Sequence, residues 1–273
     1  MISALRSGAS GREEPLTPSV ESVAQLYRKY APALRRVREQ QKQLYATRGN
    51  LQLERVASWL HVRALLASVG LVPEYHRLLK PQFDDLEAES TYLLLRELRP
   101  QTVVEIGPDG GWSTSWLLAA LRDNGRGQLY SYDRFDHSTR TVPRDLAAGR
   151  WTFSRGDVKQ QLHGLPPRID YLFIDCAHTE QFARWYVREL FPRLEPGTPI
   201  GIHDIFPERP GESQVIREWL LSRGVTYFTA SPQAAPAVHA RLRDLKRELG
   251  IDELIHHSQK NPMIFFRRPQ ELE

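Results

Sequence analysis

The chain has 273 residues, of which 41% are hydrophobic and 26% charged, as expected for a globular protein with one α/β domain and an appended element. No apolar run is long enough to cross a bilayer, the N-terminus lacks a signal-peptide core, and the single cysteine, Cys176, excludes an internal disulfide. The net charge of +4 comes from basic residues spread along the chain, without a dense basic tract. We therefore expect a cytoplasmic protein that binds neither membranes nor nucleic acid.

Residues 1–80 predict a helical arm that precedes any strand. Thr17-Pro18 is typical of a helix start, and apolar residues recur at helical spacing over 23–37. Gly49-Asn50 is expected to end this helix, and a second amphipathic helix is expected over 51–69. Because the apolar stripe needs a surface to pack against, we expect the arm to join subunits of a homo-oligomer or to close over an active site.

The remaining segment, 81–273, alternates helices with short apolar strands, which is the pattern of βαβ units. This alternation predicts a doubly wound α/β domain with a seven-stranded, mostly parallel, Rossmann-like sheet. The expected strands cover 102–106, 128–132, 151–154, 171–174, 199–202, 225–229 and 262–267.

Polar or glycine-rich segments follow each of the first five expected strands. They are Glu105–Gly111, Asp133, Gly156-Asp157, Asp175 and His203-Asp204. In an open parallel sheet, ligands bind beyond the carboxyl ends of the strands. These five segments therefore predict one binding site along a single edge of the sheet.

The glycine-rich turn after the first strand is the strongest local signal. Glycines allow close approach of the backbone to a ligand, and the helix that follows offers free N–H groups, although a tight structural turn would use glycines as well. Gly107, Gly110 and Gly111 do not match the G-x-G-x-x-G spacing of nicotinamide-binding proteins. Glu105, two positions before the turn, suits a positively charged ligand better than a pyrophosphate.

The segment Val104-Glu105-Ile106-Gly107 resembles the first motif of class I S-adenosylmethionine-dependent methyltransferases. Its extended form, E-I-G-x-x-x-G-x-S-T, is similar to small-molecule O-methyltransferases that act on antibiotic sugars and polyketides. The resemblance implies that the cofactor S-adenosylmethionine binds along the strand ends. It places the methionine part at Glu105, Gly107, Gly111 and Ser113, the ribose at Asp133, and the adenine at Asp157 and Val158.

Phe173-Ile-Asp-Cys-Ala-His178 resembles the F-I-D-x-x-H segment of the sugar O-methyltransferases and the corresponding segment of catechol-type enzymes. By this resemblance Asp175 is a metal ligand and His178 the general base, while His203 and Asp204 supply further ligands to Mg²⁺ or Mn²⁺. Neighbouring residues of a strand point to opposite faces, so both can reach one cation only where the strand has already turned. The alternative is that Asp204 caps a loop and that His203 is a structural, hydrogen-bonded residue.

These features together predict an O-methyltransferase that acts, with the help of a divalent cation, on a hydroxyl of a natural-product sugar, a polyketide or a phenol. One alternative is methylation of RNA, whose common Asn-Pro-Pro-Tyr-like signature is missing after the fourth strand. The other is a non-catalytic scaffold that keeps the fold and assembles through its N-terminal helices.

Overall fold

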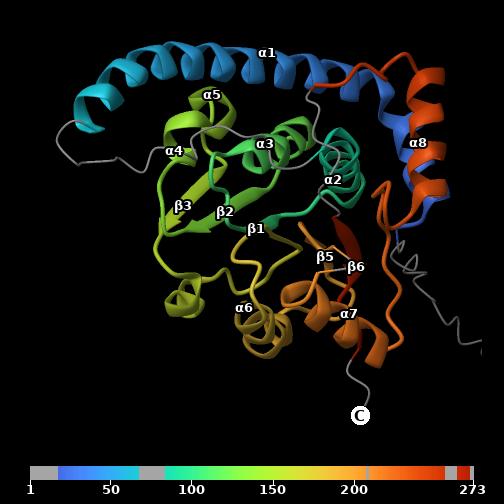
Figure 1. The fold of residues 1–273 in the computed structure, drawn as a ribbon. Helices are drawn as coiled ribbons and strands as arrows, with labels where there is room; N and C mark the ends of the chain where they lie inside the picture. The colour runs from blue at the N-terminus through green and yellow to red at the C-terminus, as the bar shows by residue number, and fades with distance from the viewer. Residues whose placement is uncertain (1–17, 68–83, 207–208, 256–262, 271–273) are drawn as a thin grey trace, which may run out of the picture.

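In the computed structural model, the described backbone comprises residues 18–67, 84–206, 209–255 and 263–270, and the side chains of 47–67 are outside the description. Its centre is a twisted sheet with the strand order β3-β2-β1-β4-β5-β6 (Figure 1). The first five strands are parallel and β6 runs antiparallel to β5. The strands are β1 Thr102–Ile106, β2 Gln128–Asp133, β3 Trp151–Arg155, β4 Tyr171–Ile174, β5 Pro199–Ile202 and β6 Ile264–Arg267.

The described part of the chain thus confirms the doubly wound α/β sheet, with six strands where seven were predicted. The expected strand over 225–229 contributes one antiparallel bridge, in which Phe228 and Phe265 exchange backbone hydrogen bonds of 2.8 Å. Within the described residues the ladder extends no further at this edge, and the neighbouring Tyr227 is 40% exposed. A segment at the edge of a sheet pairs with a strand on one side only. The apolar pattern of 225–229 therefore predicts poorly how many of its residues join the sheet.

Helices cover both faces of the sheet (Figure 1). One core lies between the sheet and α1, α2, α3 and α8, and the other lies under α6 and α7. The helices are α1 Val20–Ala67, α2 Asp85–Leu98, α3 Trp112–Asn124, α4 Ser138–Thr141, α5 Arg144–Ala147, α6 Glu180–Trp185, α7 Glu212–Ser222 and α8 Pro236–Glu248. Short helical turns lie at Val158–Gln160, Leu162–Gly164 and Phe191–Arg193, and a π-helical turn at Tyr186–Leu190 continues α6.

The arm contains one continuous helix, α1, so the expected break at Gly49-Asn50 is wrong. A glycine inside a helix costs only about 1 kcal/mol relative to alanine, and good helix formers on both sides offset that cost. The helix begins after Ser19, whose side chain accepts a hydrogen bond of 3.1 Å from the backbone N–H of Ser22. Thr17 and the expected domain boundary at residue 80 lie outside the described residues.

The first half of α1 belongs to the core of the main domain. Its buried apolar side chains pack with α2, α3 and α8; they are Val23, Leu26, Tyr27, Leu34 and Val37. A buried polar cluster strengthens this attachment. The carboxylate of Glu89 on α2 accepts hydrogen bonds from Tyr27 at 2.7 Å and Lys246 of α8 at 2.7 Å, and forms an ion pair with Arg38. The start of the arm is therefore fixed to the sheet through α2.

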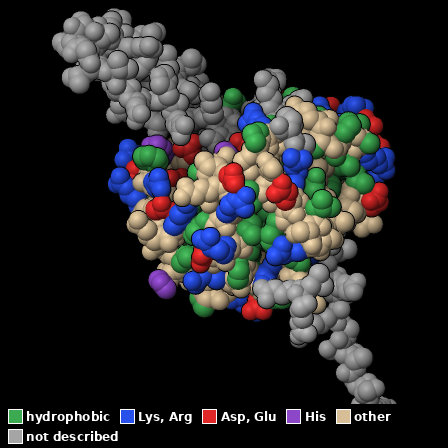
Figure 2. All heavy atoms as spheres, turned by 60° about the horizontal axis from the view of Figure 1, so that its bottom comes forward, with side chains coloured by type: hydrophobic (Ala, Val, Ile, Leu, Met, Phe, Trp, Pro, Cys, Tyr) green, Lys and Arg blue, Asp and Glu red, His purple; other side chains and the backbone are tan. Residues whose placement is uncertain are grey.

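On the side of the molecule where α6 and α7 lie, basic and acidic side chains are interspersed (Figure 2). None of the described helices combines the length and the hydropathy needed to span a membrane.

Candidate functional site

The turn after β1 brings the ends of two strands into close contact. Gly107 has a φ of 84°, and a Cβ at this position would overlap the carbonyl oxygen of Asp175, just past the end of β4. The backbone N–H of Asp175 in turn donates a hydrogen bond of 2.9 Å to the backbone oxygen of Ile106, the residue before Gly107. Only glycine fits such a conformation at such a distance. Gly107 therefore places the turn directly beside Asp175.

Glu105 lies beneath this turn rather than at the open edge of the sheet. Its side chain is fully buried and accepts hydrogen bonds from Ser113 at 2.6 Å, Thr114 at 2.9 Å and Ser131 at 2.5 Å. Burial raises the pKa of Glu105 to about 7, although the three hydroxyl donors act in the opposite direction. Glu105 and Ser113, two of the predicted cofactor residues, therefore bind each other and join β1 and β2 to the start of α3.

Gly111 caps α3 with a φ of 79° and packs closely against the segment that follows β2. A Cβ there would lie 2.7 Å from a methyl group of Val142, and the hydroxyl of Thr141 donates to the backbone oxygen of Gly110 at 2.7 Å. The second predicted glycine thus allows α4 to approach the turn.

The ends of β2 and β3 bring further predicted cofactor residues to the same edge. The carboxylate of Asp133 accepts from the backbone N–H groups of Asp109 and Phe135, each at 3.0 Å, and so connects the turn after β1 to the loop after β2. Asp157 caps the turn after β3 through the N–H of Lys159 at 3.0 Å and pairs with Arg134. Val158 is buried beside it.

A compact group of possible cation ligands lies where β4 and β5 end. Asp175, His178 and Asp204 each offer one donor atom, and all three atoms lie within 4.8 Å of one another. Nε2 of His178 is 3.3 Å from Asp204 Oδ2 and 3.7 Å from Asp175 Oδ1. The Asp175 side chain is 7% exposed and that of His178 is 39% exposed, so the group reaches from the interior to the surface.

His203 lies deeper, on the other side of Asp175. Its Nδ1 is 3.3 Å from Asp175 Oδ1 and 3.6 Å from Asp204 Oδ1, and its Nε2 is 3.5 Å from Glu87 Oε2. Burial by itself would lower the pKa of His203, but the carboxylates of Asp175 and Glu87 raise it well above its usual value. His203 therefore contacts two of the predicted ligands, while the compact donor group contains His178 instead.

The chain has turned between His203 and Asp204, as a shared site requires. Asp204 has a φ of 59° and follows the last residue of β5 by two positions. Because of this left-handed residue, two neighbours in the sequence can both approach Asp175.

Two buried glutamates that the sequence analysis did not single out complete the group. Glu212 Oε2 lies 2.8 Å from Nδ1 of His178, and Glu87 approaches His203. Glu87 forms a capping box with Asp84 at the start of α2, a pattern readable from the sequence as a helix start. No sequence signal connects either glutamate to a histidine. Glu87 on α2 and Glu212 on α7 reach His203 and His178 only because the fold packs these helices beside the ends of β4 and β5.

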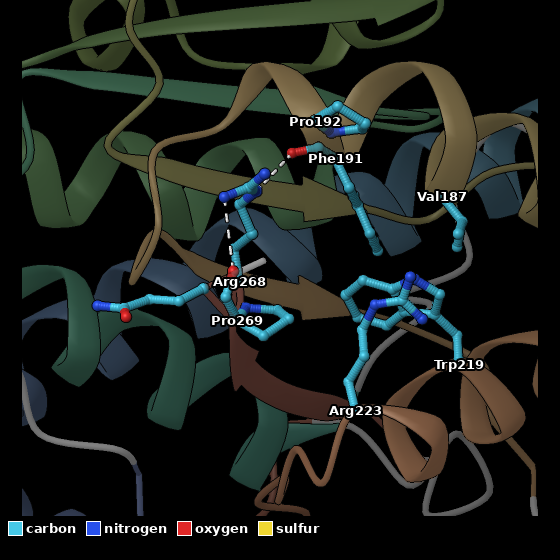
Figure 3. A pocket seen from close by; sticks show the side chains of 8 residues that line it. Val187, Phe191, Pro192, Trp219, Arg223, Arg268 and Pro269 are labelled. Carbon is cyan, nitrogen blue, oxygen red and sulfur yellow. Dashed lines mark hydrogen bonds between the residues drawn. The ribbon is translucent and has the colours of Figure 1, made fainter. Parts of the chain in front are cut away.

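A separate hollow of about 70 Å³ lies near the beginning of β5, at the end of the strand away from His203 and Asp204. It is lined by Phe191, Trp219, Arg268 and Pro269 (Figure 3). Arg267, the residue of β6 that precedes Arg268, is the antiparallel partner of Pro199, the first residue of β5. The hollow is therefore at the other end of β5 from the candidate site. Pockets for small ligands usually measure about 300–1,000 Å³, so this hollow is too small for one.

Residues 104–205 match a family model described as a methyltransferase domain. Solved structures similar to this chain include an O-methyltransferase from Bacillus cereus in complex with SAH, with 14% identity and a TM-score of 0.49, covering 91% of this chain and 100% of that one. Another is the O-methyltransferase TomG from Streptomyces achromogenes, involved in tomaymycin synthesis, with 13% identity, a TM-score of 0.46 and 92% coverage of both chains. No curated protein matches the chain.

The matched segment begins in β1, ends just after β5 and includes every candidate residue from Glu105 to Asp204. The segment that carries these residues is therefore similar to a methyltransferase domain.

Proposed function

We propose that this protein transfers a methyl group from S-adenosylmethionine to a hydroxyl of a small molecule, assisted by a divalent cation. The observation that carries the proposal is the group of Asp175, His178 and Asp204, whose donor atoms lie within 4.8 Å of one another at the strand ends of a methyltransferase domain. A natural-product sugar, a polyketide or a phenol is the class of acceptor that the sequence motifs favour.

The cofactor would lie along the ends of β1, β2 and β3. The turn from Gly107 to Gly111 and the edge formed by Asp133, Asp157 and Val158 would border it, while Glu105 and Ser113 hold the turn from below. A carboxylate such as Asp133 suits two vicinal ribose hydroxyls because it offers only acceptors. When bound, S-adenosylmethionine supplies a methyl group on a positively charged sulfur.

The acidic residues at the ends of β4 and β5 suit a divalent cation. Carboxylate oxygens of Asp175 and Asp204 are ligands that Mg²⁺ and Mn²⁺ accept. His203, whose Nδ1 lies 3.3 Å from Asp175 Oδ1, is the imidazole that would favour Mn²⁺, while Nε2 of His178 stays available for a proton. Asp204 Oδ1 is buried and accepts no hydrogen bond from the described residues. Nδ1 of His203, at 3.6 Å, is beyond hydrogen-bond distance of this oxygen, so a cation would add compensation for the buried charge.

His178 is the candidate general base. Its Nε2 faces the two aspartates, and its Nδ1 is held by Glu212. In the proposed reaction, the substrate hydroxyl gives its proton to Nε2, and Glu212 stabilises the imidazolium that forms. Burial by itself would lower the pKa of His178, but the hydrogen bond with Glu212 and the nearby carboxylates raise it above its usual value.

Ligand binding tests the cofactor assignment. S-adenosylmethionine and S-adenosylhomocysteine are expected to raise the melting temperature of the protein, whereas NAD is not. Asp133→Asn is expected to weaken S-adenosylmethionine binding about 10- to 100-fold in a calorimetric titration, because hydrogen bonds to a charged acceptor contribute roughly 1.5–3 kcal/mol.

Asp136→Asn is the matched control, since Asp136 lies in the same loop and pairs only with exposed arginines among the contacts described. Stabilisation by NAD would contradict the proposal. Absence of any binding of S-adenosylmethionine would favour the non-catalytic scaffold.

A further inference from the structure

His178 is held in place by a residue from a distant part of the chain. It lies in the loop between β4 and α6, and its side chain is 39% exposed, yet its Nδ1 is 2.8 Å from Glu212 Oε2. Glu212 is the first residue of α7, and its side chain is only 2% exposed. The pair thus joins a surface imidazole to a carboxylate within the protein.

The backbone is shaped to allow this pairing. Gly211, just before Glu212, has a φ of 82°, and a Cβ there would touch the backbone oxygen of His178 and the backbone nitrogen of Glu180, each at 3.6 Å. The start of α7 therefore lies directly against the His178 loop. Tyr186, in the π-helical turn that continues α6, is buried; burial raises the pKa of its hydroxyl, and the charge of nearby Glu212 raises it further.

The ring nitrogen that Glu212 binds determines where the other nitrogen points. A carboxylate can only accept, so the hydrogen bond requires a proton on Nδ1. Nε2 is then directed at the gap between Asp204 and Asp175, at 3.3 and 3.7 Å. Without Glu212, only the contacts of Nε2 with Asp204 and Asp175 would hold the ring, and a neutral imidazole could carry its proton on either nitrogen.

We propose that Glu212 is a positioning residue for His178, fixing the ring and its Nδ1 proton so that Nε2 faces the site between Asp175 and Asp204. The inference rests on the proposed function, in which Nε2 receives the substrate proton. Glu212 acts through His178 and touches neither substrate nor cofactor.

Nuclear magnetic resonance of the full chain, labelled with ¹⁵N-histidine, tests this assignment. The wild type is expected to show a downfield, hydrogen-bonded Nδ1 proton for His178, identified by its loss in His178→Asn. Glu212→Leu fills a similar volume without an acceptor and is expected to abolish the signal. Glu212→Gln keeps an acceptor oxygen and is expected to retain it.

Glu180→Gln is the control, because Glu180 is close to His178 in the sequence but exposed and paired with Arg184. Its spectrum is expected to match the wild type. A signal that is absent from the wild type, or that persists in Glu212→Leu, would overturn the inference. S-adenosylmethionine binding, measured on the same samples, separates this outcome from a failure of the proposed function.

Discussion

Gly107 shows how one residue determines the geometry of the site. Its positive φ and the lack of a side chain let the end of β1 lie against the carbonyl oxygen of Asp175. The turn after β1 and the group of Asp175, His178 and Asp204 are adjacent for this reason. A Cβ would push the two strand ends apart.

Gly107→Ala is therefore expected to lower the free energy of unfolding by about 3 kcal/mol or more, since left-handed strain of about 1–2 kcal/mol adds to overpacking of about 1–3 kcal/mol. Gly125→Ala is the control, because Gly125 also has a positive φ, 65°, but a Cβ there meets no atom within 4 Å. It is expected to cost only the strain. Urea denaturation of both variants measures the difference, and equal losses would contradict the argument.

Helices α1, α2 and α8 are joined through the buried carboxylate of Glu89. Both Lys246 and Glu89 are completely buried, and Arg38 is nearly so. Removing one member of such a cluster leaves buried charges without compensation, which costs about 3–5 kcal/mol. The same two helices, α1 and α2, also share a surface pair, Lys29 with Glu97 at 2.6 Å.

Glu89→Leu is accordingly expected to destabilise the protein by about 3 kcal/mol or more, because Arg38 and Lys246 lose their shared partner. Glu97→Leu is expected to cost at most about 1 kcal/mol, as the Lys29 side chain is 56% exposed. Thermal unfolding of the two variants at equal ionic strength provides the comparison. A smaller loss for Glu89→Leu than for Glu97→Leu would show that the buried cluster does not hold α1.

At the scale of the whole molecule, α1 is longer than the part of it that packs in the core. The helix has 48 residues, which corresponds to a length of about 70 Å at 1.5 Å per residue. Its first half is part of the core, whereas the stripe of Leu53, Val56 and Leu60 is known only as a sequence pattern. We propose that this second half joins subunits of a homo-oligomer.

Light scattering is expected to give a mass above the 31.5 kDa of one chain, and the double variant Val56→Glu/Leu60→Glu is expected to return the protein to that mass. Charged residues in an apolar contact lose their hydration without compensation, which disfavours association. Gln52→Glu on the same helix serves as the control.

Point variants are preferable to removal of the arm, since truncation would also remove Val23, Leu34 and Val37 from the core. A monomeric wild type at all concentrations would refute the proposal.

The sequence by itself determined the features that depend on local pattern. Strands β1, β4 and β5 have the predicted bounds, and the segments that follow the strands, from Gly107 to Asp204, lie along one edge of the sheet. Alternation of apolar residues and the position of glycines are read from a few neighbouring residues, so they can be predicted without knowledge of the fold. The same holds for the glycine-rich motif at Glu105–Gly111, which lies in the segment similar to a methyltransferase domain.

Only the tertiary structure decided which side chains meet. The break at Gly49-Asn50 did not occur, Glu105 lies beneath the turn, and His178 joins Asp175 and Asp204 in the compact donor group. Glu212 reaches His178 across 34 positions of the chain. Such contacts depend on how α2 and α7 pack on the sheet, and packing reflects the shapes and charges of the whole core, which no short sequence window contains.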